Sequence, residues 1–524
     1  MGKRRVILAV DHGTSGVKAS LVTTQGRVLA SDAEKTEVIF LPGGGAEQDP
    51  RSWWDALVRV SRRLVQSQAS GCDEIEAVCV SSTFSTTVAI DEKGDPVMNA
   101  LTWMDSMGAP HVRRLMGGFP SFMGYSIPKA LRWVSRTSGA PSLSGKDDIG
   151  HVLFVMNEMP RVYEKTRLFL PSKDYLNMRL TGERAATFDS VHLFWLTDVR
   201  DLARIRYDKD LVRESGIDPS KLPPLVASTD VLGHIAPGVA DEMGLRQGVK
   251  VVAGSPDHQC ACIGSAAVED YQGHLYVGTS SWVQCLVPFK KTDVLHSIAS
   301  FPTAVGDRYQ AVNEQDMAGG ALGFLAGLVN GFSAMSAGAA GQGISYNALD
   351  EIAKGVPPGS RGVVVTPWLN GERTPVDDMH VRAGIHNLST TTTAEDIVRA
   401  FLEGVALNTR WSLKYVERFV GRRLDPLTIV GGGASSDVWC RIFADCLGRG
   451  LRRPPEPIRA NARGAAFIAA VALKDITFSD IPSLMEYERV FEPGREASRI
   501  YDELFDAFVD IYRQNRGLYR ALNG

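Results

Sequence analysis

Residues 6–21 read VILAVDHGTSGVKASL, and this stretch decides the fold of the chain. An unbroken apolar run from Val6 to Val10 is typical of a strand that is buried on both faces. Asp11 ends the run, and apolar residues resume only at Val17. The pattern predicts a β-hairpin whose tip carries a carboxylate, two hydroxyl groups and two glycines.

The predicted tip has the chemistry of a phosphate site. Backbone N–H groups and the hydroxyls of Thr14 and Ser15 are suited to hold phosphate oxygens, and glycine lets the backbone approach a ligand closely. Asp11 is suited to hold Mg²⁺, directly or through water, because this ion prefers oxygen ligands. The alternative is an ordinary hairpin turn, since a motif this short also occurs by chance.

The length and charge of the chain bound its class. A chain of 524 residues is expected to form two or more domains. Its 57 Lys and Arg against 60 Asp and Glu give a net charge of −3, so no basic excess points to nucleic acid or an anionic membrane as a partner. The seven cysteines show no zinc-finger spacing, which favours the reduced thiols of a cytoplasmic protein.

Two apolar stretches could be mistaken for targeting or membrane segments. The N-terminal run is too short for a signal peptide and stops at Asp11. Residues 317–347 lack charge but are dense in Gly, Ala and Ser, so we expect a pair of buried helices there and no membrane span.

The second half of the chain restarts like the first. Residues 216–248 are rich in Pro and Gly and are interpreted as a connector, with a domain boundary near residues 252–254. The apolar run 249–253 is expected to open the second half and leads into a turn with Asp257. A second hydroxyl-bearing hairpin follows at residues 275–281, which suggests two related domains facing one nucleotide.

A glycine-rich turn near the C-terminus is a further ligand candidate. Thr393 is expected to cap a helix over 394–419 that ends at Gly421. A strand over 427–430 then runs into GGGASS, and a helix is expected over 437–447. This order places a ligand against backbone at a helix N-terminus, although the spacing is not that of a Rossmann dinucleotide site.

Polar side chains that suit a sugar or polyol stand near two strand ends of the first half. Trp103 and Asp105 follow one short strand and are candidates for gripping a polyol, with Trp103 as a plain core residue as the alternative. The strand over 77–80 runs into a hydroxyl-rich stretch that contains Ser85 and Thr86.

Taken together, the motifs resemble the FGGY carbohydrate kinases, and most closely their xylulokinase-like branch. The resemblance extends from residue 6 to about residue 473. It rests on eight motifs in the family's order: DHGTSGVKASLV, EQDPRSWW, YSIPKALRW, LPSKDYLNMRLTG, AGSPDHQ, YVGTSSWV, PWLNGERTP and IVGGGASSDVWCRIFADCLG.

The resemblance implies an α/β fold of two actin-like (ribonuclease H-like) domains, with mixed sheets flanked by helices and a cleft between them. Residues 1–253 would form the sugar-binding domain and residues 254–524 the ATP-binding domain. ATP with Mg²⁺ and a small-molecule sugar or polyol are the implied ligands, without nucleic acid or membrane. Dimers are common in the resembled family, so a homodimer is compatible with it.

Matching by position also implies roles for single residues. Asp11 would lie near Mg²⁺, and the residues near ATP would be Thr14, Ser15, Lys18, Thr279, Gly319, Gly432 and Ser436. The sugar would be contacted by Trp103, Asp105, Ser85, Thr86, Asp257 and His258. Asp257 matches the family's catalytic aspartate, and a carboxylate there is suited to take the proton of a sugar hydroxyl. The alternative is that Asp257 is a plain turn residue after Pro256.

The departures from the family pattern lie at the substrate. Typical xylulokinases have Met-His-Gly where this chain has Phe84, Ser85 and Thr86, and glycerol kinases have an Arg-Glu pair there that this chain lacks. His258 stands where Asn or Gln usually follows the catalytic aspartate, and it either contacts the sugar or supports the turn. The reaction type is therefore better defined than the substrate.

The leading hypothesis is an ATP-dependent kinase acting on a terminal hydroxyl of a ketose, such as xylulose, ribulose or a hexulose, or of a polyol. A non-catalytic sugar- or nucleotide-sensing protein on the same fold is one alternative, and an actin-like ATPase is another. Asp11, Thr14 and Asp257 together argue against a sensor, which has no need of a base aimed at the γ-phosphate.

Overall fold

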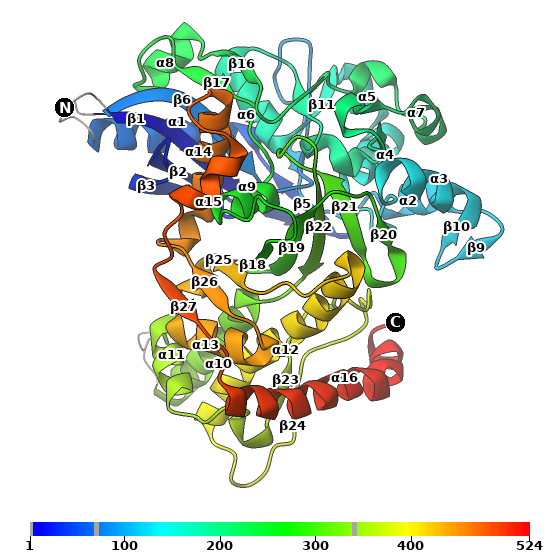
Figure 1. Ribbon diagram of the computed structural model, residues 1–524. Helices are drawn as coiled ribbons and strands as arrows, with labels where there is room; N and C mark the ends of the chain where they lie inside the picture. The colour runs from blue at the N-terminus through cyan, green and yellow to red at the C-terminus, as the bar shows by residue number, and fades with distance from the viewer. Residues whose placement is uncertain (1–3, 68–72, 338–342) are drawn as a thin grey trace.

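The computed structural model describes residues 4–67, 73–337 and 343–524, which form two halves, one above the other in Figure 1. Each half contains a mixed β-sheet flanked by helices, as the sequence predicted. One helix does not follow the division: α14 (Ala460–Ala472) is near the C-terminus in sequence but lies on the sheet of the N-terminal half.

The main sheet of the N-terminal half has the strand order β16-β17-β6-β1-β2-β3. The bounds are Val231–His234 (β16), Lys250–Val252 (β17), Asp73–Ser82 (β6), Arg4–Gly13 (β1), Gly16–Thr23 (β2) and Val28–Lys35 (β3). β1 and β2 are antiparallel with Asp11 opposite Lys18, and β1 is parallel to β6 with Asp11 opposite Ser81. The predicted hairpin is confirmed, with Thr14 and Ser15 as its two-residue tip.

The strand expected over 249–253 exists, but its place in the fold was predicted wrongly. β17 does not open the second half; it pairs with β6 and β16 inside the N-terminal sheet. The region taken as a connector supplies β16 and helix α8 (Pro237–Met243). An apolar run indicates a strand that is buried on both faces, but it does not identify the neighbouring strand. The hydrophobic pattern alone therefore assigned this strand to the wrong half of the chain.

Two helices cover the two faces of this sheet. α1 (Pro50–Ser67) packs on the face that carries Leu8 and Val10, whereas α14 packs on the face that carries Ile7 and Ala9. Asp49 caps the start of α1, since its carboxylate accepts a hydrogen bond from the Arg51 amide at 2.9 Å. Because both faces are covered, the strand end at Asp11 is buried in protein on all sides but the tip.

A second sheet of the N-terminal half has the order β11-β7-β8-β5-β4. Its strands are Leu168–Pro171 (β11), Thr87–Ile90 (β7), Ala100–Leu101 (β8), Gly45–Gln48 (β5) and Ile39–Leu41 (β4). The nearby helices are α2 (Ala109–Met116), α3 (Ile127–Thr137), α4 (Asp148–Glu158), α5 (Pro160–Lys165), α6 (Ser172–Thr181) and α7 (Lys209–Ser215). Two-stranded pairs complete this half: β9 (Ser121–Phe122) with β10 (Tyr125–Ser126), β12 (Ala186–Thr187) with β15 (Leu225–Val226), and β13 (Thr197–Asp198) with β14 (Arg206–Tyr207).

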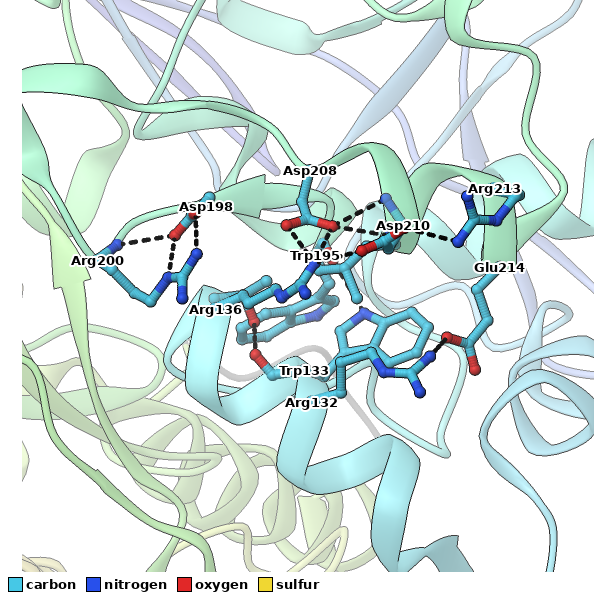
Figure 2. Close-up of polar contacts among 12 residues, drawn as sticks. Arg132, Trp133, Arg136, Trp195, Asp198, Arg200, Asp208, Asp210, Arg213 and Glu214 are labelled. Atoms are coloured by element: carbon cyan, nitrogen blue, oxygen red, sulfur yellow. Dashed lines mark hydrogen bonds and ion pairs between the residues drawn. The ribbon is translucent and has the colours of Figure 1, made fainter.

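Charged pairs attach α3 to α7, as Figure 2 shows. Arg136 contacts Asp208, and Arg132 lies 2.5 Å from Glu214. Asp208 also caps α7, because its Oδ1 accepts hydrogen bonds from the Asp210 and Leu211 amides at 3.0 Å. Below these pairs, the indole N–H of Trp133 donates to the carbonyl of Trp195 at 3.0 Å.

The C-terminal half contains a sheet in the order β20-β21-β22-β19-β18-β25-β26-β27. The bounds are Thr292–Asp293 (β20), Ile298–Pro302 (β21), Tyr309–Gln315 (β22), Ser281–Val287 (β19), Gly273–Val277 (β18), Leu427–Val430 (β25), Leu451–Arg453 (β26) and Arg489–Phe491 (β27). A separate pair joins β23 (Val364–Thr366) to β24 (Gly384–His386). The predicted hairpin over 275–281 is the β18–β19 pair.

The helices of this half include two whose predicted ends are confirmed. α12 (Ala394–Val420) begins with a capping box between Thr393 and Asp396 and ends at Gly421, and α13 (Asp437–Leu447) follows the glycine-rich turn. The others are α10 (Gly319–Ala337), α11 (Tyr346–Lys354), α15 (Ile481–Leu484) and α16 (Arg495–Asn523), while α9 (Asp257–Gly264) lies between the halves.

Residues 317–347 differ from the expected pair of buried helices. One helix of this region, α10, buries Ala321, Leu322 and Leu325 but leaves Phe324 and Leu328 exposed, and the next helix begins only at Tyr346. Residues 338–342 lie outside the described part of the chain. None of the helices described is long and apolar enough to cross a membrane.

Candidate active site

Asp11 lies at the end of β1, where that strand meets α14. Its Oδ1 accepts a hydrogen bond from the amide of Asn461 at 3.2 Å, and its Oδ2 lies 3.8 Å from the ammonium of Lys18. Burial raises the pKa of the Asp11 carboxyl, Lys18 opposes this rise, and Asp257 adds to it. The fold brings Asp257 to the same strand end, because Pro256 bridges to Ser82 and Ser82 pairs with His12.

The hairpin tip is held open toward solvent. Ser15 is exposed, and Thr14 is half-buried with its hydroxyl oxygen accepting a hydrogen bond from the Trp103 indole at 2.9 Å. Gly16 has φ of +152°, and a Cβ there would lie 2.2 Å from the carbonyl oxygen of Glu34. Glycine is thus required beside the tip, and the fold brings the predicted phosphate residue Thr14 to the predicted sugar residue Trp103.

Asp257 is the first residue of α9 and follows a tightly packed turn. Gly254 has φ of +72°, and a Cβ there would lie 2.1 Å from the carbonyl oxygen of Val80, so the turn closes directly on β6. Pro256 forms a bridge with Ser82 at the end of that strand. The Asp257 side chain is half-buried, and its carboxylate accepts a hydrogen bond only from the next amide, that of His258, at 2.8 Å.

His258 presents a buried imidazole with a free nitrogen. Its ring packs against Phe84 with 4.7 Å between ring centroids and an angle of 41° between the planes, and its Nε2 has no hydrogen-bond partner among the described residues. Its backbone carbonyl accepts a hydrogen bond from Gln284 at 2.7 Å. The backbone of His258 therefore supports the turn, while the unpartnered side-chain nitrogen favours the interpretation that it contacts a ligand.

Ser85 and Thr86 lie beside Phe84 and are both buried. Ser85 has φ of +56°, and its hydroxyl donates to the carbonyl of Lys146 at 2.7 Å. The Thr86 hydroxyl lies 3.4 Å from that of Thr83. The fold brings these two hydroxyls to the Phe84–His258 contact, so three of the predicted site residues, Ser85, Thr86 and His258, share one region with Asp257.

Asp105 is placed differently from Trp103. It is fully buried, and its two carboxylate oxygens accept hydrogen bonds from the amides of Ala46 and Met107, each at 3.0 Å. Burial raises the pKa of the Asp105 carboxyl, and those amides oppose the rise. In this structure Asp105 organises its own loop, and its contact with a sugar stays a prediction.

The predicted nucleotide residues of the C-terminal half gather around the end of β18. Thr279 lies in the β18–β19 turn, and its carbonyl accepts a hydrogen bond from the Ala318 amide at 2.8 Å. A Cβ on Gly319 would lie 2.7 Å from the carbonyl of Gly278, and one on Gly431 would lie 2.5 Å from that of Val277. Three turns are thus in backbone contact, and the space beside the predicted residue Gly432 is open within 4 Å.

Ser436 lies at the end of the same glycine-rich turn. Its hydroxyl accepts a hydrogen bond from the Trp439 amide at 3.0 Å and so caps α13. The N-terminus of α13 thus follows directly on the glycine-rich turn, an order typical of a site where a helix start meets a ligand.

Sequence reasoning missed several charged or polar residues of this region. Arg373 lies 2.5 Å from Glu314. Burial and the charge of Asp257 raise the pKa of the Glu314 carboxyl, and Arg373 opposes this rise. Arg373 belongs to the PWLNGERTP motif, which could have drawn attention to it. Asn461 is hydrogen-bonded to Asp11 across 450 residues of sequence, and the charge of Arg459 also acts on Asp11. No local sequence pattern indicates either residue.

The comparison with known families bears on this arrangement. Residues 6–264 match the N-terminal domain, and residues 274–473 the C-terminal domain, of the FGGY family of carbohydrate kinases. The chain belongs to this family. Its FGGY relatives include a xylulose kinase of Staphylococcus epidermidis, 27% identical over 98% of this chain and 98% of that protein. They also include a gluconokinase of Bacillus subtilis, 24% identical over 98% and 97% of the two chains.

Solved structures show the same two-domain FGGY fold. The ligand-bound xylulose kinase of Lactobacillus acidophilus superimposes with a TM-score of 0.84 at 21% identity, covering 99% of this chain and 100% of that one. The fold class expected from the sequence is therefore confirmed.

Proposed function

We propose that this FGGY protein transfers the γ-phosphoryl group of Mg·ATP to a terminal hydroxyl of a ketose or polyol. The observation that carries the proposal is the position of Asp257: Pro256, the residue before it, bridges to Ser82, which pairs with His12 next to Asp11. The carboxylate at the start of α9 thereby follows the strand end beside Asp11, and β1 continues from Asp11 into a hairpin tip suited to phosphate. A general base next to a phosphate site is the arrangement that phosphoryl transfer to an alcohol needs.

Asp257 is assigned the role of base. A sugar hydroxyl is a weak nucleophile near neutral pH, and Asp257 would orient it and accept its proton as the new P–O bond forms. The single backbone hydrogen bond that the carboxylate accepts leaves lone pairs for that proton. Thr14, Ser15 and Lys18 would hold the phosphates, with Thr279, Gly319, Gly432 and Ser436 on the nucleoside side.

Mg²⁺ fits the side chains around Asp11. Asp11 is an acceptor, and beside it lies the buried Oδ1 of Asn461, which has no hydrogen-bond partner. No cluster of three or more His, Cys, Asp or Glu side chains able to hold a metal is found within residues 4–67, 73–337 and 343–524. Asp11 would therefore hold the ion together with water and phosphate oxygens, and the ion would supply charge neutralisation on the phosphates.

The sugar side is assigned to Ser85, Thr86, Trp103, Asp105 and His258. Thr86 offers a hydroxyl that both donates and accepts, and Ser85, whose proton goes to the Lys146 carbonyl, offers an acceptor, which suits a polyhydroxylated substrate. We assign sugar binding to residues 1–253 and ATP binding to residues 254–524, with α14 returning to the first sheet. We also infer a cytoplasmic location, which is supported by free thiols at the six cysteines of the described chain.

ADP release from Mg·ATP, with and without added substrate, tests the proposal. The panel should contain xylulose, ribulose, hexuloses, four- and five-carbon polyols and, because one relative is named a gluconokinase, gluconate. We expect turnover only with an added substrate. ADP release that is independent of every substrate would favour the ATPase alternative, and nucleotide binding without turnover would favour the sensor.

A further inference from the structure

Asn461 is a buried amide whose oxygen has no hydrogen-bond partner within the part of the chain that the structure describes. It lies in the first turn of α14 with 8% of its surface exposed. Its nitrogen donates to Asp11 at 3.2 Å, and its Oδ1 has no hydrogen-bond partner. A buried acceptor without a donor is unfavourable, so the site is built for a ligand that donates a hydrogen bond.

The orientation of this amide follows from its neighbour. An ionised carboxylate only accepts hydrogen bonds, so the amide nitrogen of Asn461 faces Asp11 and the oxygen faces away. Two acceptors, the Asp11 carboxylate and Asn461 Oδ1, are consequently carried by two side chains that are hydrogen-bonded to each other. Phosphate oxygens do not donate, and a hydroxyl has one proton to give, whereas a water bound to a metal ion has two.

The cations nearby place this pair at the phosphate end of the site. Lys18 lies 3.8 Å from Asp11, and Arg459 stands two residues before Asn461. The crossing of α9 and α14 fixes the distance between Asn461 and Asp257, because a Cβ on Gly464 would lie 1.8 Å from the carbonyl of Cys260. Asn461 and Asp257 therefore stand on two helices that cross in direct contact.

We propose that Asn461 and Asp11 together bind the hydration shell of the divalent cation that accompanies the nucleotide. Water bound to Mg²⁺ is polarised and donates strongly, and this ion keeps several waters when it binds to proteins. Asn461 also orients the Asp11 carboxylate through its amide nitrogen. This inference rests on the proposed function, since it presupposes that the site binds a metal–nucleotide complex.

The inference is tested by the ratio of the ATP dissociation constant in EDTA to that in excess Mg²⁺. Both constants are measured by titration calorimetry without sugar. For Asn461→Ala we expect the ratio to fall by about 10-fold or more, the usual effect of losing a partner of a metal-bound group. For Asn461→Asp we expect the ratio to equal or exceed that of the wild type, because the second carboxylate repels free ATP but favours the ion. Binding of Mn²⁺ with ADP, followed by electron paramagnetic resonance, should weaken in Asn461→Ala.

Asn515→Ala is the control, because that amide donates only to the carbonyl of Ile511 in its own helix. An unchanged ratio in Asn461→Ala, or an equal fall in Asn461→Ala and Asn461→Asp, would overturn the inference while leaving the kinase proposal intact. A wild type that bound ATP in neither condition would overturn the proposed function and this inference together.

Discussion

Gly264 and Gly464 lie in backbone contact where α9 crosses α14. A Cβ on Gly264 would lie 1.9 Å from the carbonyl oxygen of Ala460 and 2.7 Å from the nitrogen of Gly464. Asp257 begins α9, and Asn461 stands in the first turn of α14. The crossing therefore sets how far the candidate base lies from the pair of acceptors at Asp11.

Gly464→Ala should destabilise the protein, although alanine is the better helix former by about 1 kcal/mol. The added methyl group would meet the Cys260 carbonyl, and overpacking of this kind costs about 1–3 kcal/mol. Urea unfolding measures the change. Gly517→Ala is the matched control, since Gly517 lies within α16 with nothing within 4 Å of its Cβ position, and it should be neutral or stabilising. A stabilised Gly464→Ala variant would show that the helices do not meet this closely.

Thr14→Val should weaken ATP binding by about 10-fold, the value of one good hydrogen bond. The variant keeps the shape of the side chain but removes both the hydroxyl offered to phosphate and the acceptor of the Trp103 indole. Calorimetry with ATP measures the affinity, and tryptophan emission reports on the indole. Thr14→Ser should retain both, so equal losses in the two variants would argue against a role for the hydroxyl.

His258→Asn should raise the KM for the substrate several-fold and leave the dissociation constant of Mg·ATP unchanged. The imidazole nitrogen without a partner lies beside Phe84 and next to the candidate base, on the side assigned to the sugar. Steady-state kinetics on the best substrate of the panel separates KM from kcat. An unchanged KM together with a lower unfolding temperature would instead assign His258 to support of the turn.

Asp148 should make folding stability depend on pH in a direction opposite to that of most carboxylates. Burial raises the pKa of its carboxyl to about 7, and Thr87 donates to it at 2.6 Å. Because the folded state holds this proton more tightly than the unfolded state, the contribution is complete below about pH 4 and is lost as the pH rises through 7. The loss is on the order of a few kcal/mol for a fully buried group.

The difference between wild type and Asp148→Asn isolates this effect from the other titrating groups. The free energy of unfolding of the wild type should fall relative to that of the variant between pH 4.5 and 7.5, on the scale of the buried-group shift. Asp241→Asn, at an exposed position on α8, should show no such trend. A pH-independent difference for Asp148→Asn would contradict the raised pKa.

The parts of the fold that local signals encode were predictable from sequence. α12 begins and ends where Thr393 and Gly421 indicated, because capping chemistry is decided within one turn of the chain. The hairpin tip at Thr14 and Ser15 followed equally from a buried strand, a glycine pair and a second apolar run.

Long-range relationships were not predictable in the same way. Nothing near Asn461 in the sequence indicates that its partner is Asp11, and the apolar run of β17 does not identify β6 as its neighbour. Asp105 matched a sugar-contacting position, but a residue type and spacing do not reveal that backbone amides already occupy both of its oxygens. Such facts depend on how distant segments pack.

The most direct test of the account is kcat for substrate-dependent ADP release by wild type and Asp257→Asn at saturating substrate and Mg·ATP. Loss of a general base should lower kcat by about 10²-fold or more, while the dissociation constant of Mg·ATP stays close to that of the wild type. A kcat for Asp257→Asn equal to that of the wild type would contradict the assignment of Asp257 as the base.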